Sequence, residues 1–397
     1  MNSIVIAPTF LKPSCAVGQI ERHFFPNLPK AFYSHIICAN EIICMEGDNF
    51  ITHIVPERKS VLKLDLLFRK LGWRDLVYSP DITYYSWCGL AFKEASKLIE
   101  NERINYIHTI NNPVSAHLVG YRLKMKYGIP WIAQFYDPWY NNPVRKYCFD
   151  YFKKKDYERE KLLAEYADII LFPNYELLNA FNDLYGNIIN GSMAVIPFIT
   201  EIPCRNTLTT FPNKCMNDVL TISHIGTLSA DRRADVFLLA LANLKQRIPE
   251  LKLMVNFVGN MYSEDLKIIK ELNLQSIVNV VGKVSESECQ SYYENSDLFM
   301  IIDMNFRPNL FYPSKLLKYF CYGKPIFGIA DKDSVVAHEL VKTKNRVFSF
   351  EDIDGISSFI EQAVTDYSSI CVNDIDYGSK FKTDNVIKQY VNLIEKI

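Results

Sequence analysis

The sequence contains no apolar run long enough to cross a membrane. A membrane-spanning helix needs about 20 consecutive apolar residues, and no stretch of the 397-residue chain approaches that length. The amino terminus, MNSIVIAPTF, has no basic residues ahead of an apolar segment and reads directly as a β-strand, so no secretory signal is expected. These two absences predict a cytoplasmic protein.

The sequence also lacks the common metal-binding spacings. Its ten cysteines include no C-x-x-C pair, and its seven histidines include no H-x-x-x-H pair. Zinc sites are typically built on such spacings, so we expect free cysteines in a reducing compartment. Three D-x-D strings occur at 331–333, 352–354 and 374–376. They fall late in the chain, in expected loops, and we interpret them as chance. We expect no metal ion and no cofactor.

Two further absences exclude other classes of protein. Neither a G-x-x-x-x-G-K-[ST] phosphate loop nor a G-x-G-x-x-G motif occurs, so an ATPase and a dehydrogenase lack support. The formal net charge of −1 argues against nucleic-acid binding through bulk electrostatics. Apolar residues make up 49% of the chain and charged residues 22%, which is ordinary for a globular protein.

What the sequence does contain is a regular alternation of strand-like apolar runs with amphipathic helical segments. This pattern predicts parallel α/β sheets. The chain is too long for one ordinary core, and residues 199–216, with two prolines and a threonine cluster, read as a linker. We therefore predict a Rossmann-like domain over 1–200, a second over 201–382, and a helix over 383–397 that packs back towards the first domain. The default ligand site is a cleft between the two domains.

The segment YPSKLLKYFCYGKPIFG (312–328) predicts a helix that begins with Ser314 as N-cap and stops at Gly323. Its first turn carries Lys315 and Lys318. Cations are unfavourable there because the amino terminus of a helix is its positive end. A bound anion would remove this conflict, since helix amino termini bind phosphate readily.

Basic residues recur at the same expected edge of the second domain. The turn TLSADRR follows the strand LTISHIG and places Arg232 and Arg233 at the start of the next helix. The turn VVGKVS adds Lys283, and Ser285 with Glu288 forms a capping box. The carboxyl ends of parallel strands share one edge of a sheet, so this edge is predicted to bind a pyrophosphate. His224, inside a strand, is expected to be a core residue.

These motifs resemble those of a known family. The order strand-Gly-turn-Arg-helix, strand-Gly-x-Val-Ser and PSKLxxYxxxGKPI is similar to the carboxyl-terminal domain of GT-B nucleotide-sugar glycosyltransferases, in particular glycosyltransferase family 4. In the first half, GIPWIAQFYDPW (128–139) resembles a segment of the transferases that build bacterial surface polysaccharides such as O-antigen and capsule. The resemblance covers nearly the whole chain.

The resemblance implies a metal-independent, retaining hexosyltransferase of lipopolysaccharide or capsule synthesis. Its partners would be a nucleotide-sugar donor and a lipid-linked saccharide acceptor. It further implies Asp137, Arg232 and Lys315 as the catalytic group, with Tyr136 and Asp137 on the acceptor side. The donor-binding residues implied are Gly18, Gly226, Thr227, Arg232, Arg233, Lys283, Val284, Pro313, Ser314, Lys315 and Lys318.

The sequence departs from the family pattern at two positions. Lys318 stands where the family commonly has an acid that accepts hydrogen bonds from ribose, and Leu310 stands where many members have a glutamate. A lysine cannot accept those bonds. Two alternatives to a transferase therefore stay open: a sugar-nucleotide epimerase of GT-B fold, and a catalytically weak GT-B scaffold or accessory subunit.

Two stretches, 57–78 and 143–155, interleave Arg and Lys with Trp, Phe and Tyr. One interpretation is a solvated helix with one buried face. The other is an interfacial contact with an anionic membrane, which would suit a lipid-linked acceptor. In the second case the protein is peripheral on the inner face of the cytoplasmic membrane.

Overall fold

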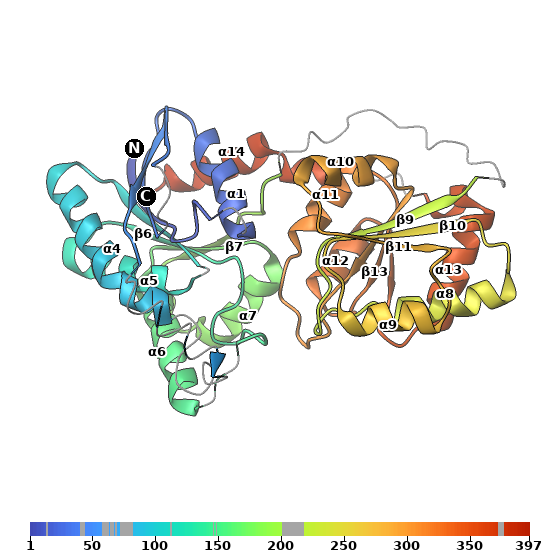
Figure 1. Ribbon diagram of the computed structural model, residues 1–397. Helices are drawn as coiled ribbons and strands as arrows, with labels where there is room; N and C mark the ends of the chain where they lie inside the picture. Colours follow the sequence, from blue (N-terminus) through green and yellow to red (C-terminus); the bar gives the residue numbers. More distant parts are fainter. Residues whose placement is uncertain are drawn as a thin grey trace. The chain divides into compact units, whose positions relative to one another are not determined.

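The computed structural model describes residues 1–12, 15–39, 44–57, 63, 67, 70–71, 82–111, 113–145, 147, 149–200, 218–371 and 377–397. The chain divides into two compact units (Figure 1). Unit 1 comprises Met1–Glu201 and Thr383–Ile397, and unit 2 comprises Ile202–Lys382. Each unit contains one predominantly parallel β-sheet covered by helices, which confirms the predicted α/β class with two parallel-sheet domains.

The sheet of unit 1 has the order β3-β4-β2-β1-β5-β6-β7-β8. All neighbouring strands pair in parallel except β3, which is antiparallel to β4. The strands are β1 (Asn2–Ile6), β2 (Tyr33–Cys38), β3 (Glu46–Gly47), β4 (Phe50–Ile54), β5 (Tyr106–Ile110), β6 (Trp131–Gln134), β7 (Ile169–Phe172) and β8 (Ser192–Val195). The β3–β4 hairpin is an addition that the alternation pattern did not reveal.

The helices of unit 1 are α1 (Ala16–Phe24), α4 (Ile82–Asn101), α5 (Ser115–Tyr127), α6 (Asp150–Tyr166), α7 (Tyr175–Tyr185) and α14 (Thr383–Ile394), with a 3₁₀ turn at Phe25–Asn27. The helix α5 packs between α4 and α6. It ends at Gly128, whose φ of 67° is the left-handed conformation that glycine adopts without strain. None of the helices in the described ranges is both long enough and apolar enough to span a bilayer.

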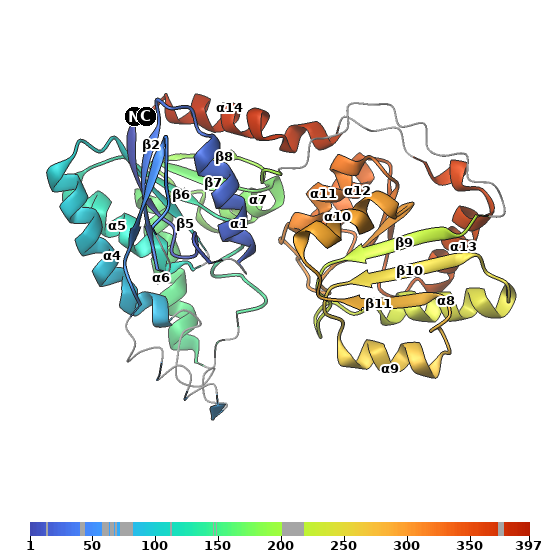
Figure 2. The same ribbon diagram turned by 45° about the horizontal axis from the view of Figure 1, so that its top comes forward.

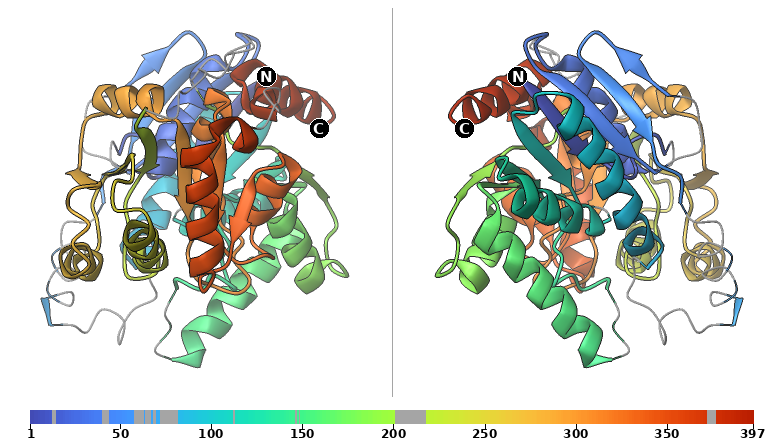
Figure 3. Two further views of the ribbon diagram at one scale, coloured as in Figure 1. Left: turned by 90° about the vertical axis from the view of Figure 1, so that its right-hand side faces the viewer. Right: turned by 90° about the vertical axis from the view of Figure 1, so that its left-hand side faces the viewer.

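The carboxyl-terminal helix α14 is part of unit 1 and ends three residues before the chain terminus. Its apolar face buries Val386, Ile387 and Ile394. The ring of Tyr390 packs edge-on against Phe24 of α1, with centroids 4.9 Å apart, and the two helices lie side by side (Figure 2 and Figure 3). Burial of this face, rather than intrinsic helix propensity, is the main source of stability for such a helix.

Unit 2 contains a six-stranded, fully parallel sheet with the order β11-β10-β9-β12-β13-β14. The strands are β9 (Leu220–Ile225), β10 (Leu253–Val258), β11 (Val278–Gly282), β12 (Leu298–Ile302), β13 (Ile326–Ile329) and β14 (Arg346–Phe348). The first strand of the unit, β9, therefore lies at the centre of the sheet. Its carboxyl end adjoins β12 on one side and β10 on the other, which is where loops from both halves of the unit converge.

The helices of unit 2 are α8 (Asp235–Arg247), α9 (Ser263–Glu271), α10 (Glu286–Asn295), α11 (Ser314–Tyr322), α12 (Val335–Lys342) and α13 (Ile353–Thr365), followed by 3₁₀ turns at Tyr367–Ile370 and Tyr377–Phe381. Figure 2 shows α8 and α9 on one face of the sheet and α10 and α11 on the other. The predicted capping box is confirmed: Ser285 accepts from the Glu288 N–H, and the Glu288 carboxylate accepts from the Ser285 N–H.

We expect Tyr390→Phe to destabilise unit 1 by about 1–3 kcal/mol, because it leaves a buried acceptor unsatisfied. The Tyr390 hydroxyl lies 2.8 Å from His108 Nδ1, and His108 Nε2 lies 2.8 Å from Gln134 Oε1, all in the core. The amide oxygen can only accept, so Nδ1 is left to accept from the tyrosine. Denaturant unfolding measures the effect. Tyr151→Phe, at a side chain that is 63% exposed, is the control; equal stability of the two variants would contradict the prediction.

Candidate functional site

The candidate site in unit 2 is built on Gly226, the residue that follows β9. Its φ of 144° is a conformation that L side chains rarely adopt. A Cβ atom placed on it would lie 2.7 Å from Lys315 Nζ, which is closer than two such atoms can approach. The backbone conformation therefore favours glycine here, and a larger residue would also displace the end of the Lys315 side chain.

Lys315 lies in the first turn of α11 and donates to His224 in β9. The two side chains meet with Lys315 Nζ 3.0 Å from His224 Nε2, and His224 Nδ1 lies 3.2 Å from the carbonyl oxygen of Met300 in β12. A carbonyl oxygen can only accept, so Nδ1 carries the ring hydrogen and Nε2 accepts from the lysine. The expectation that His224 is a core residue is confirmed, since it is fully buried, but it also contacts the predicted site.

Arg232 and Asp303 complete the cluster. Arg232 lies in the turn between β9 and α8. Two backbone hydrogen bonds close this turn: the Arg232 N–H donates to the Ser229 carbonyl at 2.9 Å, and the Ser229 N–H donates to the Arg232 carbonyl at 3.2 Å. Asp303 follows β12 and is fully buried. Arg232 Nε and Asp303 Oδ2 are both buried and have no hydrogen-bond partner within the described part of the chain. One orphan donor and one orphan acceptor thus lie in a single cluster, a cost that a ligand would relieve.

The charges of this cluster are held in an unfavourable environment. Burial, and then repulsion from Arg232, lowers the pKa of Lys315 well below its ordinary value, although Asp303 opposes this. Burial also lowers the pKa of Arg232 and, with the repulsion from Lys315 and Arg232, lowers that of His224. Burial raises the pKa of Asp303 to about 6 against the effect of the two cations. A ligand that brings negative charge would stabilise the cationic forms.

The helix α11 begins one residue earlier than predicted. Pro313 is the N-cap, so Ser314 is the first helical residue, and no side chain caps the helix. The prediction that Ser314 is the N-cap is therefore wrong, because the extended backbone of Pro313 already supplies the turn. No acid lies in the first turn either. The end of the helix is as predicted, at Gly323 with a φ of 62°.

Two predicted phosphate ligands are held by carboxylates instead. Lys318 Nζ lies 3.1 Å from Glu286 Oε1 at the start of α10. Arg233 Nε lies 2.6 Å from Asp265 Oδ1 in α9, and its guanidinium covers the ring of Tyr262 at 5.1 Å. Lys315 and Arg232 differ from these two residues, because no carboxylate of the described ranges lies within ion-pair distance of either.

The remaining predicted donor residues lie in loops at the carboxyl edge of the same sheet. Thr227 is exposed directly after Gly226, and exposed Lys283 and partly buried Val284 follow β11. Leu310, at the position where many family members carry a glutamate, is buried. The structure thus brings Gly226, Lys315 and Arg232 together, with His224 and Asp303 as members that sequence reasoning did not assign to the site.

In unit 1, Asn111 fixes the segment that contains Tyr136 and Asp137. Its side-chain oxygen accepts from the Tyr136 N–H at 2.6 Å, and its amide group donates to the Asp137 carbonyl at 2.7 Å. The ring of Tyr136 is buried and stacks on Phe198, with centroids 5.0 Å apart. Both residues directly follow β6, so they lie at the carboxyl edge of the unit 1 sheet, where the resemblance expects them.

Gly18 has a packing role in α1. A Cβ atom there would lie 2.3 Å from the carbonyl oxygen of Thr9, so glycine lets the loop after β1 lie against the helix.

On the same helix Glu21 is buried, and neither carboxylate oxygen has a partner among the described residues. Burial raises the pKa of Glu21 against the effect of Arg22, so its protonated form is favoured.

The D-x-D strings within the described ranges have structural roles. Asp331 pairs with Arg307, and Asp352 caps α13 by accepting from the Gly355 N–H at 2.9 Å. The string at 374–376 lies outside the described residues. In the part of the chain that the structure describes, no group of three or more His, Cys, Asp and Glu residues is arranged to hold a metal ion.

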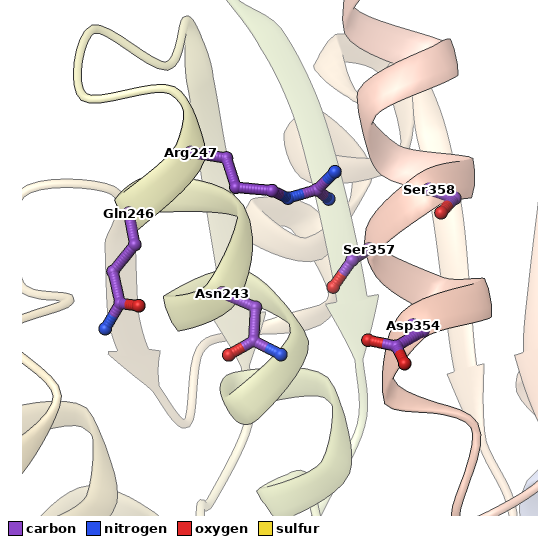
Figure 4. Close-up of a pocket in the computed structure, with 6 residues that line it drawn as sticks. All are labelled: Asn243, Gln246, Arg247, Asp354, Ser357 and Ser358. Atoms are coloured by element: carbon purple, nitrogen blue, oxygen red, sulfur yellow. The ribbon is translucent and has the colours of Figure 1, made fainter.

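A separate polar pocket lies between α8 and α13 in unit 2 (Figure 4). It is lined by Asn243, Gln246, Arg247, Asp354, Ser357 and Ser358. The Arg247 guanidinium is already paired with Glu361 at 2.7 Å. Since Asn243 is eight residues after the start of α8, the pocket lies about 12 Å along the helix from its Arg232 end. It is therefore distinct from the cationic cluster.

We expect Asp303→Asn to stabilise unit 2 at neutral pH but not in acid. The pKa of Asp303 is raised to about 6 from 3.8, so its contribution to stability is present below pH 4 and is lost as the pH rises through 6. The variant should therefore gain about 3 kcal/mol relative to the wild type between these limits. Denaturant unfolding at pH 4 and pH 7.5 measures it, with exposed Asp333→Asn as control. A pH-independent difference would refute the assignment.

Comparisons with known proteins give structural neighbours but no sequence family. No protein-family model and no curated protein matches the chain. The sucrose-phosphate synthase of Thermosynechococcus elongatus superposes with a TM-score of 0.70 at 14% identity, covering 100% of this chain and 98% of that one. The Anabaena protein HepE, in complex with UDP, gives 0.66 at 14% identity and covers both chains fully. The apo lipopolysaccharide outer core galactosyltransferase WaaB gives 0.65 at 12%, again over both whole chains. At these identities the likeness shows the fold alone: the chain has the GT-B fold.

Proposed function

We propose that the protein transfers a sugar from a nucleotide-sugar donor to a saccharide acceptor, and that unit 2 binds the donor diphosphate. The observation that carries this proposal is the cluster of Lys315 and Arg232 at the end of β9. Two partly buried cations without an ion-pair partner among the described residues are costly. A diphosphate would satisfy both cations and the orphan Nε of Arg232.

The same groups suit the chemistry of transfer. When the bond to the sugar breaks, negative charge accumulates on the departing nucleoside diphosphate. Lys315, Arg232 and the free amides of the first turn of α11 would stabilise that charge where it develops. This arrangement needs no metal ion, and by its resemblance to family 4 the reaction would retain the anomeric configuration. Asp137 and Tyr136 in unit 1 are the proposed acceptor-side residues, with Asp137 in the catalytic group.

We assign the proposed transferase to the synthesis of bacterial surface polysaccharide in the cytoplasm. This assignment is supported by the DPW segment and by the likeness to WaaB, a lipopolysaccharide outer core galactosyltransferase. HepE has been solved with UDP and with UDP-glucose, so these nucleotides are the first to test. A hexose donor and a lipid-linked acceptor complete the proposal.

A second candidate, a catalytically weak scaffold, is favoured by one observation. Lys318 occupies the position of the family acid and pairs with Glu286, and a lysine cannot accept hydrogen bonds from ribose as that acid would. A panel of sugar nucleotides separates the two candidates. Slow hydrolysis or thermal stabilisation by one of them favours the transferase, whereas a scaffold need not respond to any.

We expect Arg232→Ala and Lys315→Ala each to weaken binding of a nucleoside diphosphate at least about tenfold. Each variant removes a charge-assisted hydrogen bond of about 1.5–3 kcal/mol. Calorimetric titration with UDP, GDP, ADP and dTDP measures the affinity. Because both cations are destabilised by burial, the melting temperature should not fall. Lys270→Ala, on the exposed surface of α9, is the control, and unchanged affinity in both test variants would rule out the diphosphate site.

We further propose that the start of α6 contacts an anionic membrane surface. Phe149 and Tyr151 are 54% and 63% exposed, and Lys153, Lys154 and Lys155 are exposed beside them. Exposed aromatic rings next to several lysines are typical of interfacial contacts. Most of the other predicted stretch, 57–78, lies outside the described residues.

Binding to vesicles tests this surface. The protein should sediment with vesicles that contain anionic lipid and should dissociate as salt rises, because each lysine contributes about 1 kcal/mol near such a membrane. Replacing all three lysines by glutamate should abolish that binding, while Lys267→Glu on α9 should leave it intact. Equal partitioning to neutral and anionic vesicles would show that the contact is not electrostatic.

A further inference from the structure

We propose that His224 is a positioning residue: it holds the Lys315 ammonium beside Arg232 so that both cations meet one diphosphate. This inference rests on the proposed function of the same site. It concerns a residue inside β9, whose side chain is fully buried and which the sequence pattern assigned to the core. Its role therefore follows from the structure and not from the sequence pattern.

The first step is the direction of the hydrogen bonds. The Met300 carbonyl fixes the hydrogen of His224 on Nδ1, as established above from their 3.2 Å contact. Nε2 then presents its lone pair to Lys315 Nζ at 3.0 Å. The imidazole is thus a neutral acceptor for the ammonium, and its orientation is set by the neighbouring strand β12.

The second step is the charge of the acceptor. A flexible lysine next to Arg232 would otherwise turn away, because like charges repel across a poorly solvated site. A carboxylate at position 224 would also hold the ammonium but would cancel its charge, as Glu286 does for Lys318. A neutral imidazole holds Lys315 in place and leaves its positive charge available. This is the property that an anion site requires.

The third step concerns protons. The groups that face Lys315 are His224, Arg232 and Asp303, and the neighbouring Tyr319 hydroxyl is engaged by the Ile225 N–H and the Met300 carbonyl. Before an anion binds, burial and Arg232 both favour the neutral amine of Lys315, which still donates to His224 Nε2. A bound diphosphate adds negative charge, which favours the ammonium and the protonated Asp303. Diphosphate binding should therefore be accompanied by proton uptake.

Two isosteric variants separate the functions of the ring. In His224→Asn the amide group takes the place of Nδ1, so the bond to Met300 can persist while the acceptor for Lys315 is lost. In His224→Gln the side chain reaches the place of Nε2, so an acceptor for Lys315 remains. Inorganic pyrophosphate is the probe, because it needs no assumption about the nucleotide base. Calorimetric titrations at pH 7 in two buffers of different ionisation enthalpy give both the affinity and the number of protons bound.

We expect His224→Asn to bind pyrophosphate at least about tenfold more weakly than the wild type, and His224→Gln to recover most of that affinity. Proton uptake should be measurable in the wild type and in His224→Gln. A merely structural histidine would instead show equal affinities in all three proteins, or losses that follow the melting temperature, and either result overturns the proposal. If the wild type binds neither pyrophosphate nor any nucleoside diphosphate, the proposed function itself fails, and the positioning role fails with it.

Discussion

The close approach of Lys315 to the backbone of Gly226 is the constraint on which the candidate site depends. Gly226 follows β9 with a φ of 144°, a conformation that L side chains rarely adopt, and the Lys315 side chain from the first turn of α11 lies against it. Because β9 is the central strand of its sheet, the loops after β9 and β12 converge on the same point and deliver Arg232 and Asp303. The backbone conformation of Gly226 thus accommodates the cationic cluster.

The cluster is destabilised by its own composition. Three of its members, Lys315, Arg232 and Asp303, have pKa values shifted by burial towards their neutral forms. A protein gains nothing in stability from such an arrangement, since isolated buried charges are expensive. Strongly shifted pKa values in a concentrated group are typical of functional sites. The concentration of unpaired cations and shifted pKa values in this cluster is therefore the main physical argument that it binds a ligand of opposite charge.

Much of the fold could be predicted from local signals in the sequence. The helix end at Gly323 and the capping box at Ser285 depend on a few adjacent residues, and both predictions are confirmed. The alternation of strands and helices predicted two parallel sheets, because each run has its own periodicity. The β3–β4 hairpin did not follow, since two residues of β3 carry no periodicity at all.

In the candidate site of unit 2, only the residues that belong to a recognisable sequence motif could be predicted. Arg233 and Lys318 satisfied the same sequence criteria as Arg232 and Lys315, yet acids on α9 and α10 engage them. Those acids are 32 residues away from their partners in each case, a separation that no local pattern reports. His224 and Asp303 were missed for the converse reason: a buried polar residue in or after a strand becomes meaningful only when its neighbours across the sheet are known.

The central claim is that Lys315 and Arg232 share one diphosphate. A crystal structure of the protein with the nucleoside diphosphate that stabilises it most tests this claim directly. The account predicts phosphate oxygens within about 3 Å of Lys315 Nζ and of the Arg232 guanidinium, with the Lys315–His224 contact retained. A nucleotide bound elsewhere, or one whose phosphates contact neither cation, would contradict it.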